Sequence, residues 1–495
     1  MSYKLPPATC LFLTVPKSSL AKFLEEARYL IMFRPDILKA IDQDLDQHAL
    51  TKKESRLKDR QWIYENQATL PGLTIDIRKR LSKPSLQPGR PRMRAESTFF
   101  FWMLCVYGGG GVKSRRTRDL ILESKSVELF LQEQNINAYG LSTIHENTNA
   151  ISQATREMVM DAQIELAKQD NLDDFKKCQV DSTVVTANTS WPTDSSIMFK
   201  LIRRLNLRCR KLKKQGMLSI DLPEMADVIK ELKSLDFRIS NTPKNKPEVR
   251  NQLYRSFIDE IEVASQDVAL KILELHDALG HTNLRPSKKN RLQSQFDNIC
   301  KDLDDLNLAI EHNIMRIEDG KTAPVTERVL SVSDPDAAYI QKGSREAKIG
   351  YKPQLCRSEK GLVTAFLLPI GNAGDAPLLQ ELCSQSFKRT KMVPAEFSAD
   401  GGYASRKNRQ WLLDKGVEKP SFSSSKGKQI TDEKEWNSPE YLKLRNWRSA
   451  VEALMSQLKD LVGFGSLLRR GIECVRAELT GKIIAFNFLK MMSLR

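Results

Sequence analysis

Apolar residues recur at helical spacing through the first third of the chain. Leu20, Phe23, Leu24 and Ala27 fall on one side of a helix, and the same periodicity continues from Glu96 to about residue 164. The segment 96–107 is apolar on nearly every side, which is typical of a helix inside a core. We therefore predict a helical N-terminal part.

A second apolar pattern predicts helices that pack on one another between residues 194 and 318. Six residues there are spaced by 4, 3, 4, 3 and 4 positions: Leu292, Phe296, Ile299, Leu303, Leu306 and Ile310. Spacing of this kind forms a continuous apolar seam along a helix. We therefore expect a helical bundle or hairpin with its own core.

Strand-like segments lie on both sides of this helical block. Residues 172–187 are rich in β-branched side chains, and after Pro324 the segments 347–358 and 361–370 predict a hairpin. Further strands are expected at 395–403 and 418–425, separated by helices, and 438–462 is expected to form one helix. Alternating strands and helices indicate an α/β layer into which the helical block is inserted.

These patterns predict four regions. The first is an N-terminal helical region with a basic linker (1–95), and the second is a helical, helix-turn-helix-like domain (96–170). The third is a two-part α/β domain (171–196 and 326–495), interrupted by the fourth, a helical insertion (197–325). The pattern of 96–170 fits a DNA-binding domain and any other small helical domain, so both interpretations stay open.

Composition points to a polyanionic partner. The 495 residues carry 78 Lys and Arg against 62 Asp and Glu, a formal net charge of +16. Such a basic chain commonly binds nucleic acid. The apolar run 99–107 is too short to span a bilayer, and we expect neither a membrane partner nor a secretory signal. The eight cysteines form no C-x-x-C pair, which favours a reducing cytoplasm over a zinc site or disulfides.

Two basic segments are candidates for contact with DNA. Arg90, in the sequence GRPR, has the setting of an arm that enters a minor groove, although an ordinary basic linker has the same composition. Residues 200–215 form a densely basic helix, and we single out Arg203, Arg204, Lys211 and Lys214. Binding to phosphates and a solvated helix face are both compatible with that helix.

Three carboxylates occupy informative places in the predicted order of elements. Asp181 lies inside the first strand, Asp400 ends the strand before Gly401, and Glu452 lies on the last-but-one helix, on the face of Arg448 and Lys459. Carboxylates from two strands and a helix can converge on a pair of Mg²⁺ ions, which can activate the water and stabilise the leaving oxyanion in phosphodiester cleavage. By contrast, Asp194 and Asp375 are expected to cap helices.

With these residues the chain resembles the DDE transposases of bacterial insertion sequences. The blocks QVDSTVVTANTSWPTDSS and FSADGGYAS resemble the segments of that family that carry its first two aspartates. Arg448, Glu452 and Lys459 reproduce the R-x3-E-x6-K spacing of its glutamate signature, and the ISNCY-type group is the nearest in pattern. Two features depart from the family: Arg445 stands where the signature usually has a tyrosine, and the insertion is helical rather than β-rich.

The resemblance implies a function and a fold. It implies an RNase H-like mixed sheet with flanking helices, in which Asp181, Asp400 and Glu452 hold Mg²⁺, with Mn²⁺ as a substitute. It implies a transposase that cleaves inverted-repeat ends and joins their 3′-hydroxyls to target DNA, as a homodimer or larger synaptic complex near the bacterial nucleoid. A non-catalytic DNA-binding repressor and a nuclease without strand transfer remain the alternatives.

Overall fold

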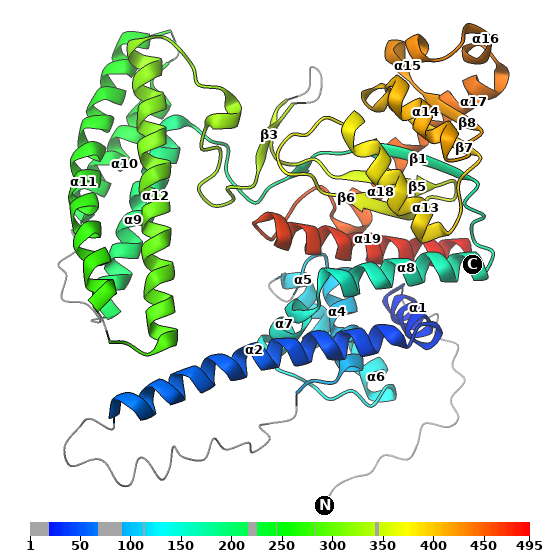
Figure 1. The fold of residues 1–495 in the computed structure, drawn as a ribbon, viewed down its shortest axis with the longest axis horizontal. Coiled ribbons are helices and arrows are strands. Elements are labelled where there is room, and N and C mark those ends of the chain that lie inside the picture. The colour runs from blue at the N-terminus through cyan, green and yellow to red at the C-terminus, as the bar shows by residue number, and fades with distance from the viewer. Residues whose placement is uncertain are drawn as a thin grey trace, which may run out of the picture.

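A computed structural model describes residues 19–67, 92–111, 114–215, 225–243, 245–281, 283–341 and 346–495. The protein is mixed α/β and mostly helical (Figure 1). Arg90 lies outside the described residues, as do most of the basic linker and part of the first region.

The N-terminal part is helical, as predicted. Its core helix is α4, in which 11 of the 13 residues, from Ala95 to Val106, are buried. Gly108 follows the last turn, and Gly109 to Gly111 adopt positive φ angles that end the helix. The helices are α1 (Ser19–Phe33), α2 (Asp36–Gln67), α4 (Ala95–Tyr107), α5 (Arg115–Glu123), α6 (Lys125–Glu133), α7 (Leu141–Ala150) and α8 (Gln153–Gln169).

Four helices with a core of their own form a lobe beside the sheet (Figure 1). The lobe follows β1 and β2 in the chain, and its seam residues Leu292, Ile299 and Leu306 are buried. The chain segments that precede and follow the lobe are joined by a hydrogen bond of 2.8 Å between the hydroxyls of Thr189 and Ser331. The helices are α9 (Asp194–Gln215), α10 (Ala226–Asn241), α11 (Pro247–His281) and α12 (Pro286–Glu318), followed by the 3₁₀ turn η1 (Val325–Glu327).

A five-stranded mixed sheet carries the candidate site. Its order is β6-β5-β1-β7-β8, in which β1, β7 and β8 are parallel while β5 and β6 form the predicted antiparallel hairpin. This arrangement is consistent with an RNase H-like domain. The strands are β1 (Lys177–Ser182), β5 (Gln354–Ser358), β6 (Val363–Leu367), β7 (Glu396–Ala399) and β8 (Lys419–Phe422). A small second sheet joins β2 (Val185–Thr186), β4 (Lys348–Tyr351) and β3 (Ala338–Ile340).

Helices cover both faces of the main sheet. One face packs on α13 (Leu379–Thr390) and α14 (Arg406–Asp414), and the other lies against α18 (Ala450–Val462) and α19 (Ile472–Leu494). The remaining elements are η2 (Ala376–Leu378), η3 (Gly401–Tyr403), α15 (Ser424–Ile430), α16 (Glu433–Trp436) and α17 (Pro439–Trp447).

The buried helix α19 joins the N-terminal helices to the sheet. In Figure 1 it runs alongside α8 beneath the strands, and the Gln163 amide donates a 2.9 Å hydrogen bond to the carbonyl of Ile484. On its other side, the Asn487 amide bonds both the N–H and the carbonyl of Val363 in the edge strand β6. One continuous apolar cluster therefore extends from α1 to β6.

Candidate active site

Asp181 and Asp400 stand next to each other in the register of the sheet. The parallel pairing of β1 with β7 runs from Lys177 opposite Glu396 to Val180 opposite Ala399, so the two aspartates follow the last paired residues. The third parallel strand ends at the same level, and the hydroxyl of Ser423 donates a 3.0 Å hydrogen bond to Asp400 Oδ1. Carboxyl ends of parallel strands are where α/β proteins bind ligands.

The alternation of side chains places both aspartates on the face beneath α17 and α18. Successive side chains of a strand point to opposite faces, so Asp181 shares a face with Gln179, and Asp400 with Ser398. The Gln179 amide donates to the carbonyl of Arg448 at 2.6 Å, and the Ser398 hydroxyl donates to the carbonyl of Leu444 at 3.2 Å. The strands are thus fastened to the helices that carry Arg448 and Glu452.

The segment 438–462 forms two helices, and the prediction of a single helix was wrong. Helix α17 ends at Trp447 and α18 begins at Ala450, with Arg448 and Ser449 between them. The hydrogen bond from Gln179 engages the Arg448 carbonyl at this junction. The break therefore lies against β1, and Glu452 comes in the first turn of α18.

Arg448 connects two of the three carboxylates. Its Nη1 lies 3.5 Å from Asp400 Oδ1, and its Nη2 lies 3.7 Å from Glu452 Oε1. The side chain of Glu452 is 69% exposed, that of Asp400 46% and that of Arg448 31%. Lys459 is also exposed, two turns further along α18. Glu452 and Lys459 therefore lie on one solvent-accessible side of α18, and Arg448 stands just before that helix and pairs with Glu452.

The donor chemistry of the site fits a hard divalent cation in part. Asp181, Asp400 and Glu452 offer carboxylate oxygens, the ligands that Mg²⁺ prefers. Among the residues that the structure describes, however, no three His, Cys, Asp or Glu side chains stand close enough together to hold a metal ion. The two aspartates share a strand-end position, and the guanidinium of Arg448 lies between Asp400 and Glu452.

A buried polar network under the site was missed by the sequence analysis. Lys352 Nζ lies 2.8 Å from Asp375 Oδ1, which also accepts a 2.9 Å hydrogen bond from the Gln354 amide, and the Tyr403 hydroxyl donates to Gln354. Burial raises the pKa of Tyr403, and the nearby carboxylates of Asp375 and Asp181 raise it further. The network therefore links the turn after Asp400 to the region of Asp181.

The two predicted aspartate caps were wrong. Asp375 precedes η2, but its side chain makes no capping hydrogen bond and pairs with Lys352. Helix α9 is capped by Thr193, whose Oγ1 accepts from the Ser196 N–H at 3.3 Å, while Asp194 pairs with Arg316 at 3.4 Å. Both aspartates find partners that are remote in the sequence.

The basic residues of α9 divide into two groups. Arg204 is held inside the lobe, because its Nε donates to Asp302 Oδ2 at 2.8 Å and its Nη1 donates to the Val332 carbonyl. Asp302 itself is buried. By contrast, Arg203, Lys211 and Lys214 are exposed on the outer side of the helix. These three remain available for contact with a polyanion.

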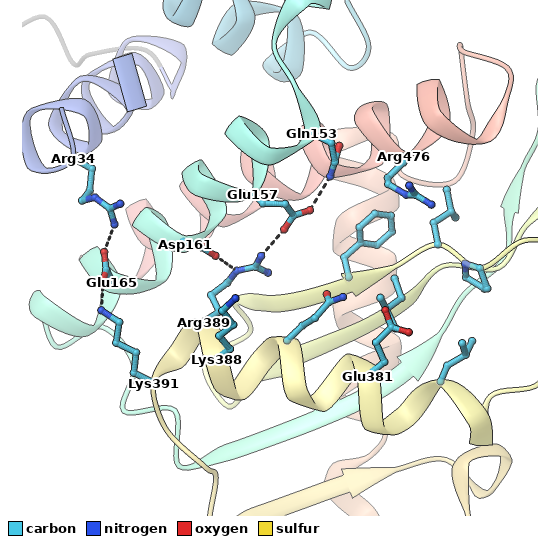
Figure 2. Close-up of a pocket in the computed structure, with 16 residues that line it drawn as sticks. Arg34, Gln153, Glu157, Asp161, Glu165, Glu381, Lys388, Arg389, Lys391 and Arg476 are labelled. Carbon is cyan, nitrogen blue, oxygen red and sulfur yellow. Dashed lines mark hydrogen bonds and ion pairs between the residues drawn. The ribbon is translucent and has the colours of Figure 1, made fainter. Parts of the chain in front are cut away.

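A cavity of about 770 Å³ lies between α8 and α13, beside the edge strand β6, and is distinct from the strand ends that carry Asp181 and Asp400. Figure 2 shows Glu157 and Asp161 of α8 directed at Arg389 of α13, and Glu165 placed between Arg34 and Lys391. The carboxylates of Glu157, Asp161 and Glu165 are thus all paired with cations. These ion pairs join α8 to α13 across the cavity.

Comparison with known protein families finds a match to part of the chain. Residues 314–488 match the family model described as the transposase DDE domain, which supports a DDE transposase. The matched segment includes Asp400, Arg448, Glu452 and Lys459, whereas β1 with Asp181 precedes it. Neither a curated protein nor a solved structure matches the chain. Within the described part of the chain, no helix is both long and apolar enough to cross a membrane.

Proposed function

We propose that the protein is a DNA transposase that cleaves the ends of its own mobile element and joins them to target DNA. The observation that carries the proposal is the register of β1 and β7, which sets Asp181 beside Asp400 under the helix of Glu452. The match of residues 314–488 to the transposase DDE domain supports it. We infer an ISNCY-type insertion-sequence enzyme with an RNase H-like catalytic domain.

In this proposal Asp181, Asp400 and Glu452 ligate two Mg²⁺ ions, for which Mn²⁺ substitutes. Such ions activate an attacking oxygen and stabilise the leaving oxyanion in phosphodiester chemistry. The carboxylates would hold the ions in place, and no side chain is required as a nucleophile. Arg448, just before α18, and Lys459, on the exposed side of α18, neutralise phosphate charge next to the scissile bond.

The proposed partners are double-stranded DNA and further copies of this chain. The net charge of +16 favours binding to the phosphate backbone, and the exposed residues Arg203, Lys211 and Lys214 give the helical lobe a basic side. Two element ends must be held together for joining, so we expect a homodimer or larger synaptic assembly on the inverted repeats.

The Asp400→Ala variant tests the catalytic assignment. We expect it to abolish Mg²⁺-dependent cleavage of DNA that carries the inverted repeats flanking the gene, while the variant still binds that DNA in a gel-shift assay. The substitution removes a ligand that acts in the transition state and removes no positive charge. Asp414→Ala, an exposed carboxylate on α14, is the matched control and should cleave normally.

The same assay separates the proposal from its two alternatives. Wild-type protein that shifts the DNA and leaves it whole would be a repressor, and cleavage without joined products would indicate a nuclease. Loss of DNA binding in Asp400→Ala would mean that the carboxylate has a structural role, and the metal assignment would then fail.

The role of α9 is tested by replacing Arg203, Lys211 and Lys214 with glutamine. If this side of the helix binds DNA, affinity falls and the slope of log affinity against log salt becomes shallower by about 0.9 for each phosphate that the variant no longer neutralises. An unchanged slope would assign these residues to a solvated face. Arg204→Gln serves as the contrast, because its ion pair with Asp302 predicts a lower melting temperature and an unchanged salt slope.

A further inference from the structure

The guanidinium of Arg448 would compete with a bound cation for the carboxylates of Asp400 and Glu452. Its guanidinium lies within 3.5 Å of Asp400 and 3.7 Å of Glu452, so one positive group spans the two carboxylates. Its backbone is fixed, since the Gln179 amide donates to the Arg448 carbonyl at 2.6 Å. The side chain can therefore change partners while the helix junction that carries it stays in place.

Two arrangements of this site exclude each other. When Arg448 spans Asp400 and Glu452, the described residues contain no group of three ligands for a metal ion. A cation bound by both carboxylates would repel the guanidinium, because like charges at this separation raise the free energy. Arg448 is then released from both carboxylates, and a DNA phosphate accepts the same hydrogen-bond donors as a carboxylate.

We propose that Arg448 is a positioning residue that couples metal binding to DNA binding. Without DNA, its guanidinium engages Asp400 and Glu452 and weakens the binding of a divalent cation. A DNA phosphate draws the guanidinium away and frees both carboxylates. This inference rests on the proposed function and adds a regulation to it: the metal site is completed on the substrate.

Thermodynamic linkage makes the coupling between cation binding and DNA binding reciprocal. If DNA raises the affinity for the cation by a given factor, the cation raises the affinity for DNA by the same factor. Ion pairs that are one-third to two-thirds exposed are weak individually, so we expect a coupling of about three- to tenfold. Weaker binding of the cation to protein without DNA would limit cleavage at unintended sites.

The test measures Mn²⁺ affinity by calorimetry on the full-length protein without DNA. We expect Arg448→Gln to bind Mn²⁺ about three- to tenfold more tightly than wild type, because the competing cation is removed. Arg445→Gln is the matched control: Arg445 lies in α17, three residues before Arg448, and stacks on Trp436, 4.3 Å from the ring centroid, so its replacement should leave Mn²⁺ affinity unchanged. Thermal melting checks that both variants fold.

A second measurement addresses the coupling itself. The affinity for a duplex of the element end, followed by fluorescence anisotropy, should rise about three- to tenfold on addition of Ca²⁺ in wild type. The rise should vanish in Arg448→Gln and persist in Arg445→Gln. Equal Mn²⁺ affinity in wild type and Arg448→Gln, or a Ca²⁺ effect that survives in Arg448→Gln, would overturn the inference.

The outcomes distinguish this inference from the proposed function. If Asp400→Ala abolishes Mn²⁺ binding while Arg448→Gln has no effect on it, the metal site stands and the coupling is wrong. If Mn²⁺ binding is insensitive to Asp400→Ala, the metal site itself is wrong and both proposals fall.

Discussion

At the scale of single residues, Gly401 is required by the close approach of two chain segments. A Cβ atom at this position would lie 1.9 Å from the Ser424 Oγ and 2.8 Å from the Ser423 carbonyl oxygen. The backbone after Asp400 can therefore pack on the start of α15 only without a side chain. This packing holds the turn that carries Asp400 against the end of β8.

We predict that Gly401→Ala destabilises the protein by about 1–3 kcal/mol, because inserted atoms force the backbone apart. The measurement is the free energy of unfolding, with cleavage activity expected to fall as Asp400 moves. Gly374→Ala is the control, since a Cβ there would meet only Pro377 Cδ at an ordinary 3.7 Å. Equal stability of the two variants would contradict the structure of this turn.

Single residues also show which side-chain contacts could not be predicted from the sequence. The placing of Asp400 at a strand end followed from the change of composition and the glycines that follow it, and β7 indeed ends at Ala399. The side chains of Asp194 and Asp375 were misassigned because a local capping pattern is readable, whereas their partners Arg316 and Lys352 lie on distant elements. Nothing in the sequence near Asp375 indicates a buried lysine.

At the scale of elements, an ion-pair chain joins α1, α8 and α13. Glu165 pairs with Lys391 and with Arg34, which lies just after α1 (Figure 2). The hydrogen bond from Lys391 lowers the pKa of Glu165, although partial burial opposes this, and Arg34 lowers the pKa further. The depressed pKa means that the folded state favours the ionised carboxylate.

This ion-pair chain predicts a dependence of stability on pH. A carboxyl group whose pKa is lowered by folding stabilises the folded state fully above its pKa in the unfolded chain, which is near 4.5. This stabilisation is lost as the pH falls through the pKa of the folded state. We expect Glu165→Gln to lose about 0.5–1 kcal/mol at pH 7 and almost nothing at pH 3. Urea unfolding at both pH values measures this.

The control for Glu165→Gln is Glu381→Gln, an exposed carboxylate beside the same cavity. It should leave stability unchanged at either pH. A loss for Glu165→Gln that is as large at pH 3 as at pH 7 would show that packing, rather than charge, is responsible.

Most elements were predictable from periodicity, and one informative break was not. The hairpin β5–β6, the strands β7 and β8 and the helix α14 lie where the pattern placed them. The separation of α17 from α18 escaped prediction because no Pro or Gly stands at positions 448–449. Its local cause is tertiary, as Gln179 from β1 bonds the Arg448 carbonyl there.

At the scale of the whole molecule, the lobe of α9 to α12 has an apolar cluster separate from the two clusters that cover the sheet. We predict that a fragment of residues 190–333 folds alone, since an independent core supports independent folding. Circular dichroism should show a helical spectrum and a cooperative thermal transition. A gradual, non-cooperative melt would mean that the lobe depends on α2 or the sheet, and the predicted boundaries 197–325 would need revision.

The long-range assembly was the part least accessible from sequence. Apolar periodicity indicated that α4 is buried, but it carries no information on which surfaces meet. The single cluster that joins the N-terminal helices to the sheet depends on pairs such as Gln163 and Ile484, 321 positions apart. A separate domain at 96–170 was the simplest interpretation of the local pattern, and it stays a prediction.

The hydrogen bond between Thr189 and Ser331 has a consequence for the kinetics of folding. Strands β1 and β5 are neighbours in the sheet although the whole lobe separates them in the chain, so their pairing must close a long loop. Closure entropy grows with the length of flexible chain, and such non-local pairings form slowly. Once the lobe has folded, residues 142 positions apart are already in contact, and only short segments remain to be ordered. An early-folding lobe would thus bring β1 and β5 close together and accelerate nucleation of the sheet.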